Sequence, residues 1–310
     1  MKKAAIGIDF GGTFIKMAMV NEEGKILYKK SFSTLPERDK LLEKIIQGID
    51  KTVKNKSRDI ELKGVGIGLP GPIDSINGIV RNLTNVPGWR NFPLEKFVRQ
   101  KIKMPVFIDN DANLMTYGEW RFGAGRGAKN IICITLGTGV GGGIIIEGKI
   151  YRGSSLSAGE VGHIPIFENG LKCACGGRGC LERYIGNRYI IETARKYIKK
   201  QKTIIPQDKD ITPQIISNAA GKGDSVAIKI WEEVAVHIGT ALTGLINVLN
   251  PEKVVIGGGI SKAGRFLFEP IRRVVQQNAF KVATDVCRIV PARLGDNAGV
   301  IGSAGYIMLE

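Results

Sequence analysis

The sequence predicts an α/β protein made of two similar domains around a central cleft. Segments with the pattern of strands alternate with segments of helical pattern along most of the 310 residues, which is typical of sheets covered by helices. The stretch "GIDFGGTFIKMAMV", which starts at Gly7, recurs in outline as "CITLGTGVGGGIII", which starts at Cys133. Each copy is a strand, a glycine turn that carries a threonine, and a second strand. Two copies of one unit indicate two related domains.

The elements follow from apolar runs bounded by glycine, proline or polar residues and from runs of helical periodicity. In the first part of the chain we expect strands at 4–10, 15–20, 25–32, 64–71 and 105–109, and helices at 37–55, 94–102 and 112–122. After that we expect strands at 131–136, 142–147, 149–152, 253–256 and 288–291, and helices at 225–249, 264–278 and 298–308. We place one domain at 1–112 together with the C-terminal helix 297–310, and the other at 113–296.

The composition does not favour a nucleic-acid or membrane partner. Basic residues outnumber acidic ones by 45 to 29, which gives a net charge of +16. They are spread along the chain, whereas DNA-binding proteins usually concentrate them on one face. No apolar run reaches the roughly 18 residues of a transmembrane helix. Asp9 and Gly11 interrupt the apolar start before it resembles a signal peptide. We therefore expect a cytoplasmic protein.

Two glycine turns are candidates for holding phosphate groups. A glycine turn exposes backbone N–H groups and lets phosphate oxygens approach closely, although a tight hairpin without a ligand is the plain alternative. A carboxylate precedes only the first turn and suits Mg²⁺, held directly or through water. The lysine after that turn either reaches a phosphate or faces solvent. The residues of this candidate site are Asp9, Gly11, Gly12, Thr13, Lys16, Gly137, Thr138 and Gly139.

A carboxylate for chemistry is expected in "FIDNDANL". Asp109, Asn110 and Asp111 come at the carboxyl end of a predicted strand, where open α/β sheets place their sites. Phosphoryl transfer to an alcohol needs a base for the acceptor oxygen, and Asp111 is a candidate. The alternative is that Asp111 only caps the following helix. Asp109 competes for the role, but strand alternation indicates a semi-buried structural residue.

A cluster of rare residues predicts a structural zinc site. His163, Cys173, Cys175 and Cys180 supply three thiolates and one imidazole, a closed tetrahedral set. A disulfide is a poorer explanation because Cys173 and Cys175 are too close in sequence to pair readily, and loose thiols are the remaining alternative. The metal would fix the loop and the carboxylates on either side of it, Glu160 and Glu182.

The remaining cysteines and the second histidine are interpreted as structural. Cys133 and Cys287 lie in predicted strands and are expected to be small core residues. His237 lies within a predicted helix and is expected to be packed or capped.

Nine motifs together resemble the ROK family of sugar kinases and repressors, and most closely its bacterial glucokinase members. They are "DFGGTFIK", "LPGPID", "LTNVPGW", "DNDANL", "LGTGVGGG", "GEVGH", "CACGGRGCLE", "VVIGGGIS" and "LGDNAGVIGSA". The resemblance covers nearly the whole chain and implies the two-domain fold of the actin/hexokinase-like, or ribonuclease H-like, superfamily. It also implies an ATP- and Mg²⁺-dependent kinase that phosphorylates the 6-hydroxyl of a hexose.

The resemblance assigns roles to individual residues. It makes Asp111 the general base and places the glycine turns on the ATP phosphates, with Gly258, Gly259 and the segment 294–297 bordering the adenosine. Family members often have Glu where Asp109 stands, which leaves the adjacent Asn-Asp pair intact. The implied sugar contacts are Gly71, Asn85, Asn110, Asp111, Glu160, His163 and Glu182.

The resemblance leaves the substrate open. Glucose is favoured, and N-acetylmannosamine, N-acetylglucosamine, mannose and fructose are alternatives because pocket shape decides among them. A sugar-sensing protein without a DNA-binding domain and a nucleotide-binding protein of actin type are further alternatives. Repressors of the family carry a helix-turn-helix before the first sheet, and the phosphate turn here already begins at Asp9. A homodimer is expected from the family alone.

Overall fold

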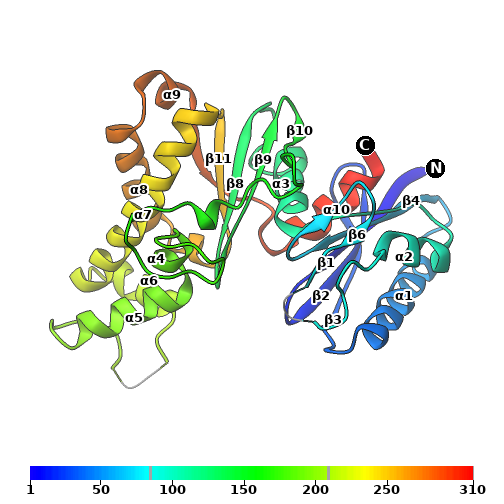
Figure 1. Ribbon diagram of the computed structural model, residues 1–310, viewed down its shortest axis with the longest axis horizontal. Coiled ribbons are helices and arrows are strands. Elements are labelled where there is room, and N and C mark those ends of the chain that lie inside the picture. The colour runs from blue at the N-terminus through cyan, green and yellow to red at the C-terminus, as the bar shows by residue number, and fades with distance from the viewer. Residues whose placement is uncertain (84–85, 208–209, 310) are drawn as a thin grey trace. The chain divides into compact units, whose positions relative to one another are not determined.

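The computed structural model describes residues 1–83, 86–207 and 210–309 (Figure 1). The chain divides into two compact units. The first comprises Met1–Gly127, Gly143–Gly159 and Leu294–Glu310, and the second comprises Ala128–Gly142 and Glu160–Arg293. The first boundary falls later than residue 112, where the sequence analysis placed it. The reason is that helix α3 (Asp111–Phe122) packs against the C-terminal helix α10 (Ala298–Leu309), so both lie in the first unit.

The first unit is built on a five-stranded sheet with the order β3-β2-β1-β4-β7. β1 pairs antiparallel with β2 and parallel with β4, and β4 pairs parallel with β7. In this register Asp9, Gly68 and Asp109 lie side by side, so the candidate carboxylates share the carboxyl edge of the sheet. The strands are β1 (Lys2–Phe10), β2 (Phe14–Asn21), β3 (Ile26–Ser33), β4 (Ile60–Leu69) and β7 (Val106–Asn110).

Helices cover both faces of this sheet. On one face α1 (Arg38–Lys54) and α2 (Leu94–Ile102), which Figure 1 shows side by side, pack on the buried side chains of Ile6 and Ile8. On the other face, α10 approaches much more closely because the strands carry glycine there. A Cβ on Gly7 would lie 1.8 Å from the Val300 carbonyl oxygen of α10. The short hairpin β5 (Ile73–Asp74) and β6 (Ile79–Val80) follows β4.

The second sheet has the order β10-β9-β8-β11-β12, in which β11 pairs parallel with both β8 and β12. Its apolar face forms one large core with the long helix α7. That helix begins where Asp224 accepts from the Ala227 N–H at 2.8 Å, and it ends at Asn250, whose φ is 41°. The elements are β8 (Ile131–Leu136), β9 (Val140–Ile146), β10 (Lys149–Ile150), β11 (Lys253–Gly257), β12 (Arg288–Pro291), α4 (Glu182–Ile185), α5 (Asn187–Ile198), α6 (Pro213–Gly221), α7 (Ser225–Leu249), α8 (Arg265–Asn278) and α9 (Lys281–Val286).

The α/β class expected from the sequence is confirmed, and each strand and helix that the sequence analysis placed is present within a few residues of its expected bounds. The sequence analysis did not individually place α4, α5, α6, α9 or the β5–β6 hairpin. Among the helices of the described residues, none combines the length and the apolar character that crossing a bilayer requires.

Candidate functional site

The first glycine turn joins β1 to β2 at the carboxyl edge of the first sheet. The Gly11 N–H donates to the Phe14 carbonyl at 3.1 Å, and the Gly11 carbonyl accepts from the Thr34 hydroxyl at 2.7 Å. A Cβ on Gly11 would lie 2.6 Å from the Phe14 carbonyl oxygen, so the close turn requires glycine here. Gly12 and Thr13 are exposed at the tip, as donors that receive a phosphate group must be.

Asp9 lies beside this turn, over the first turn of α10. A Cβ on Gly299 would fall 2.7 Å from the Asp9 carboxyl carbon, so only glycine admits the carboxylate there. Burial raises the pKa of Asp9 above its ordinary value, and the Lys16 ammonium, 3.8 Å away, opposes that rise. Lys16 also donates to the Asp296 carbonyl at 3.0 Å. A partly buried carboxylate beside a phosphate turn has the oxygen ligands that Mg²⁺ prefers.

Asn110 and Asp111 lie where β7 passes directly into α3. Asn110 is the helix cap, since its side-chain oxygen accepts from the N–H groups of Ala112 at 2.9 Å and Asn113 at 3.3 Å. The alternative in which Asp111 is the cap is therefore wrong. Asp111 occupies the first helical position, is half-buried, and accepts from the Ala112 N–H at 2.9 Å through Oδ1. The N-terminal turn of a helix stabilises negative charge, and Asp111 places a carboxylate there.

Arg152 is a residue of this site that the sequence analysis missed. Its Nε and Nη2 lie 2.9 Å and 2.7 Å from Oδ2 of Asp109, which is 1% exposed. The other oxygen of Asp109 accepts from the Asn110 N–H at 2.7 Å and the Asn113 side chain at 3.2 Å. Asp109 is thus a buried structural residue that orients the start of α3. No local pattern identifies Arg152, because it pairs with a residue 43 positions away.

Gly71 is brought next to Asn110, as the implied sugar pocket requires. The Gly71 carbonyl accepts from the Asn110 amide at 3.2 Å, and its φ of 89° is a conformation that favours glycine. Asn85, also expected in this pocket, lies outside the described residues.

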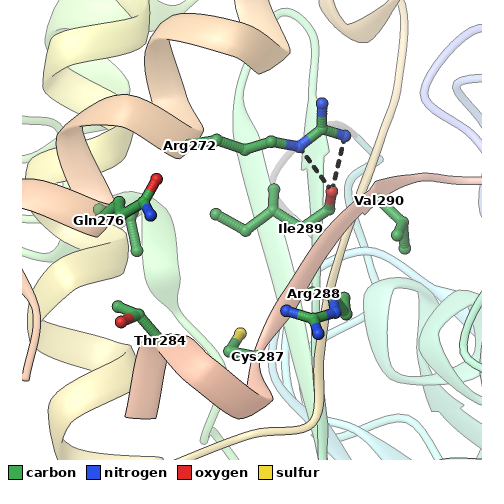
Figure 2. Close-up of a pocket in the computed structure, with 8 residues that line it drawn as sticks. Arg272, Gln276, Thr284, Cys287, Arg288, Ile289 and Val290 are labelled. Atoms are coloured by element: carbon green, nitrogen blue, oxygen red, sulfur yellow. Dashed lines mark hydrogen bonds between the residues drawn. The ribbon is translucent and has the colours of Figure 1, made fainter. Parts of the chain in front are cut away.

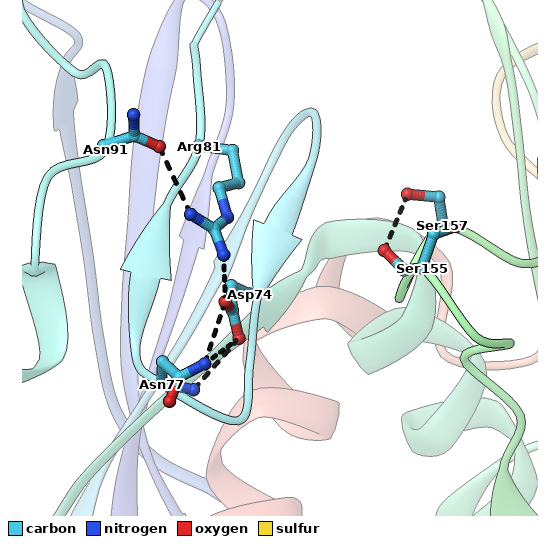
Figure 3. A network of polar contacts seen from close by, with 6 residues as sticks. All are labelled: Asp74, Asn77, Arg81, Asn91, Ser155 and Ser157. Atoms are coloured by element: carbon cyan, nitrogen blue, oxygen red, sulfur yellow. Dashed lines mark hydrogen bonds and ion pairs between the residues drawn. The ribbon is translucent and has the colours of Figure 1, made fainter.

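A polar network fixes the hairpin that follows Gly71 (Figure 3). The buried carboxylate of Asp74 accepts from the Asn77 N–H at 3.0 Å and from the Arg81 guanidinium. These donors hold the pKa of the Asp74 carboxyl below its ordinary value, and the Asn77 side chain is the largest cause. A cavity of about 300 Å³ opens between this hairpin and the serine-rich loop 154–157.

The second unit brings the four expected metal ligands together. The ligand atoms of His163, Cys173, Cys175 and Cys180 all lie within 4.8 Å of one another. The His163 Nδ1 to Cys173 Sγ distance is 3.6 Å, and the Cys175 Sγ to Cys180 Sγ distance is 3.7 Å. Zinc bonds of about 2.3 Å to sulfur and about 2.0 Å to nitrogen imply tetrahedral edges of about 3.8 Å and 3.5 Å. The donor set and its spacing therefore fit zinc.

The three thiols crowd one another in this loop. Burial and the neighbouring thiols raise the pKa of Cys180 to about 12, so the group does not ionise readily by itself. Glycines allow the tight wrap. Gly176 has a φ of 95°, and a Cβ on Gly179 would lie 1.8 Å from the Phe167 carbonyl oxygen.

The two ring nitrogens of His163 have different neighbours. Nδ1 faces the thiols, and Nε2 lies 3.9 Å from Oε2 of Glu160. Nε2 and the Glu160 carboxylate can therefore serve one polar ligand while Nδ1 serves the metal.

The second glycine turn joins β8 to β9 and is held by a hydrogen bond to the side chain of Glu182. The Gly137 N–H donates to the Gly139 carbonyl at 3.0 Å, and Thr138 and Gly139 are exposed. Oε2 of Glu182 accepts from the Val140 N–H at 2.8 Å. The sequence analysis expected Glu182 to contact a sugar and did not foresee its bond to the turn.

The glycines expected at the adenosine lie at the end of β11. Gly258 has a φ of 87°, and its Cβ would fall 2.3 Å from the Leu136 carbonyl oxygen, so the chain passes close to β8. Gly259 begins the short helix that follows. The segment 294–297, in the first unit, is anchored where the Leu294 N–H donates to Oε1 of the buried Glu119 at 2.7 Å.

The residues interpreted as structural are confirmed in that role. His237 packs against the rings of Phe167, Tyr184 and Tyr189, and burial lowers its pKa. Cys133 is buried in β8. Cys287 does not lie in a strand as expected but caps the end of α9, and it is 9% exposed at the edge of a cavity of about 380 Å³. Figure 2 shows this cavity beside Arg272, whose guanidinium donates to the Ile289 carbonyl.

Comparison with known proteins identifies close relatives. A sequence model of the ROK family matches residues 5–308. The glucokinase of Halalkalibacterium halodurans is 40% identical and is matched over 97% of this chain and 94% of its own length. A ROK family glucokinase from Streptomyces griseus, solved in complex with glucose and AMPPNP, is 35% identical with a TM-score of 0.80, over 98% of both chains.

A regulator of transcription has the same fold. A ROK family transcriptional regulator, a homologue of the Mlc protein of E. coli, is 25% identical with a TM-score of 0.90, and the match covers 99% of this chain and 78% of the regulator.

Proposed function

Because the chain belongs to the ROK family, we propose that its two glycine turns and its helix-borne aspartate serve one reaction, the transfer of the γ-phosphoryl group of ATP to the 6-hydroxyl of glucose. The observation that carries the proposal is the position of Asp111. Asn110 caps α3, so Asp111 is left in the first turn at the sheet edge where Asp9 and the first phosphate turn also lie. The names of the two glucokinase relatives, one of them solved with glucose and AMPPNP, support glucose and ATP.

In the proposed mechanism Asp111 accepts the proton of the sugar 6-hydroxyl. The resulting oxygen forms a bond to the γ-phosphorus while the bond from that phosphorus to the bridging oxygen of ADP breaks. The N–H groups of the glycine turns receive the charge of the phosphate oxygens. Asp109 and Arg152 form the buried ion pair next to the start of α3. They keep Asn110 and Asp111 in register.

Hydrogen bonds from the remaining implied residues would orient the sugar so that only one hydroxyl meets the base. The Asn110 amide already contacts the Gly71 carbonyl, and the His163 Nε2 lies beside the Glu160 carboxylate. These pairs support a polar pocket for several hydroxyl groups. The proposed sugar ligands are Gly71, Asn85, Asn110, Asp111, Glu160, His163 and Glu182.

Two metals belong to the proposal. Asp9 would hold Mg²⁺, which when bound neutralises charge on the transferred phosphate. The three thiols and His163 would hold Zn²⁺, whose contribution is structural, since a set of four protein ligands leaves no open position for substrate. The residues expected at the adenosine are Gly258, Gly259 and the segment 294–297.

Two alternatives remain as candidate functions. The first is phosphorylation of another hexose, such as N-acetylmannosamine, N-acetylglucosamine, mannose or fructose. The second is sugar sensing without phosphorylation, which the likeness to a transcriptional regulator favours. The homodimer and the cytoplasmic location stay predictions from the sequence.

The deciding experiment measures ADP release by the purified protein with Mg²⁺, ATP and each hexose of this panel. We expect glucose to give the highest kcat/KM. Phosphorylation of a different hexose in preference to glucose would correct the substrate. Saturable glucose binding without any phosphoryl transfer would replace the kinase by a sensor.

A further inference from the structure

We propose that Glu182 is a positioning residue for the nucleotide, which holds the glycine turn Gly137–Val140 in the shape that receives a phosphate group. The inference rests on the proposed function, because it takes this turn to be a phosphate site. It adds a second task to Glu182, whose expected task is a sugar contact.

The carboxylate of Glu182 lies against Gly139 and Val140, at the end of the turn. Oε2 accepts from the Val140 N–H at 2.8 Å, and a Cβ on Gly139 would lie 2.6 Å from the same oxygen. Val140 is also fixed from another side, because a Cβ on Gly162 would lie 2.4 Å from its carbonyl oxygen. The end of the turn therefore has little freedom while Glu182 stays in place.

The start of helix α5 and the glycine before it hold the beginning of the turn. The Asn187 N–H donates to the Gly137 carbonyl at 3.1 Å. A Cβ on Gly186 would lie 3.0 Å from the Thr138 carbonyl oxygen, so that carbonyl is close to the helix as well. Contacts from Glu182 at the start of α4 and from Gly186 and Asn187 at the junction of α4 and α5 thus hold the turn at both of its ends.

These contacts decide which way the N–H groups of the turn point. In a planar trans peptide the carbonyl of one residue and the N–H of the next point in opposite directions. Since the Gly137 and Thr138 carbonyls face α4, the N–H groups of Thr138 and Gly139 face away from it, and both residues are exposed. Only the Val140 N–H turns back, and Glu182 accepts it.

The acceptor oxygen, and not the negative charge, is what this task requires. A carboxylate close to a phosphate turn repels a phosphate group, so charge alone would make Glu182 unfavourable for nucleotide binding. A glutamine keeps an oxygen at the same reach and has no charge. An alanine has neither. The two substitutions therefore separate the two effects.

The test measures the dissociation constant of Mg·AMPPNP by isothermal titration calorimetry with no sugar present. Losing a hydrogen bond to a charged group weakens an interaction by roughly tenfold or more. We expect Glu182→Ala to raise the dissociation constant by about tenfold. Glu182→Gln should bind at least as tightly as the wild-type protein. Glu192→Ala is the matched control, because Glu192 pairs with the exposed Arg188 at 2.8 Å on helix α5 and has no role in the proposed site, and it should leave nucleotide binding unchanged.

A second variant protects the test against misfolding. Gly186→Ala places a methyl group 3.0 Å from the Thr138 carbonyl oxygen and should also weaken AMPPNP binding, with Glu182 intact. Wild-type affinity in Glu182→Ala, or equal loss in Glu182→Gln and Glu182→Ala, would overturn the inference. If the variants and the wild-type protein show the expected order of AMPPNP affinities but the wild-type protein phosphorylates no hexose, the kinase proposal fails and the positioning role holds. If the wild-type protein binds no AMPPNP, the kinase proposal and the positioning role of Glu182 both fail.

Discussion

Replacing Arg152 by methionine tests how much the buried ion pair behind Asp111 contributes to stability. Arg152→Met keeps an unbranched apolar side chain and removes the guanidinium that neutralises Asp109. We expect the free energy of unfolding to fall by about 3 kcal/mol, because the substitution leaves a buried carboxylate without its counter-charge.

The magnitude follows from the contacts of Asp109. Its Oδ2 loses nitrogens at 2.9 Å and 2.7 Å, and removing one partner of a buried pair typically costs about 3–5 kcal/mol. Its Oδ1 keeps the Asn110 N–H at 2.7 Å and the Asn113 amide at 3.2 Å. Because half of the carboxylate stays satisfied, the lower end of the range applies.

Urea unfolding followed by tryptophan fluorescence measures the loss. Arg99→Met is the matched control, since Arg99 pairs with Glu95 at 3.2 Å on an exposed helix face and its loss should change stability by less than about 0.5 kcal/mol. Arg152→Met combined with Asp109→Asn should recover part of the loss, because no uncompensated charge is left. Equal stability of the Arg152 and Arg99 variants, or a double variant less stable than Arg152→Met, would refute the reasoning.

Three further predictions concern catalysis, metal and pH. Asp111→Asn should lower kcat by roughly 10²–10⁴-fold with glucose affinity largely kept, and a near-normal rate would remove Asp111 from the role of base. Metal analysis should find about one zinc per chain in the wild-type protein and little in Cys180→Ala, so active, folded protein without metal would contradict the site. Burial lowers the pKa of His237 below 6.5. The unfolded chain therefore binds a proton first as the pH falls, and stability should drop progressively below pH 6.5. Urea midpoints should show a shallower drop for His237→Phe, and an unchanged slope would exclude His237 as the cause.

Local patterns were sufficient to predict most elements of the fold. The long helix of the second unit was placed at its observed bounds from its helical periodicity, and the structure shows that Asp224 caps its start and Asn250 its end. The candidate metal ligands were found because cysteine and histidine are rare in this chain, and one of its two histidines and three of its five cysteines fall within eighteen positions. Both signals depend on residue type and spacing alone.

Contacts between distant segments could not be predicted in this way. The pairing of Arg152 with Asp109 and the bond from Glu182 to the Val140 N–H join residues 43 and 42 positions apart. The residue type and the local sequence do not reveal the partner of an arginine or a glutamate, since either residue is ordinarily solvated. Asn110 was taken as a sugar ligand, and its task as helix cap became visible only where the bounds of β7 and α3 met.

The position of α10 has a consequence for synthesis of the chain. This helix lies backbone to backbone on β1 and β4, where Cβ atoms on Gly7 and Gly66 would lie 1.8 Å and 1.9 Å from its carbonyl oxygens. A ribosome makes β1 first and α10 last, with the whole second unit in between. Until α10 has been made, the face of the nascent sheet that carries Gly7 and Gly66 lacks this helix, while the second unit already has all of its own segments.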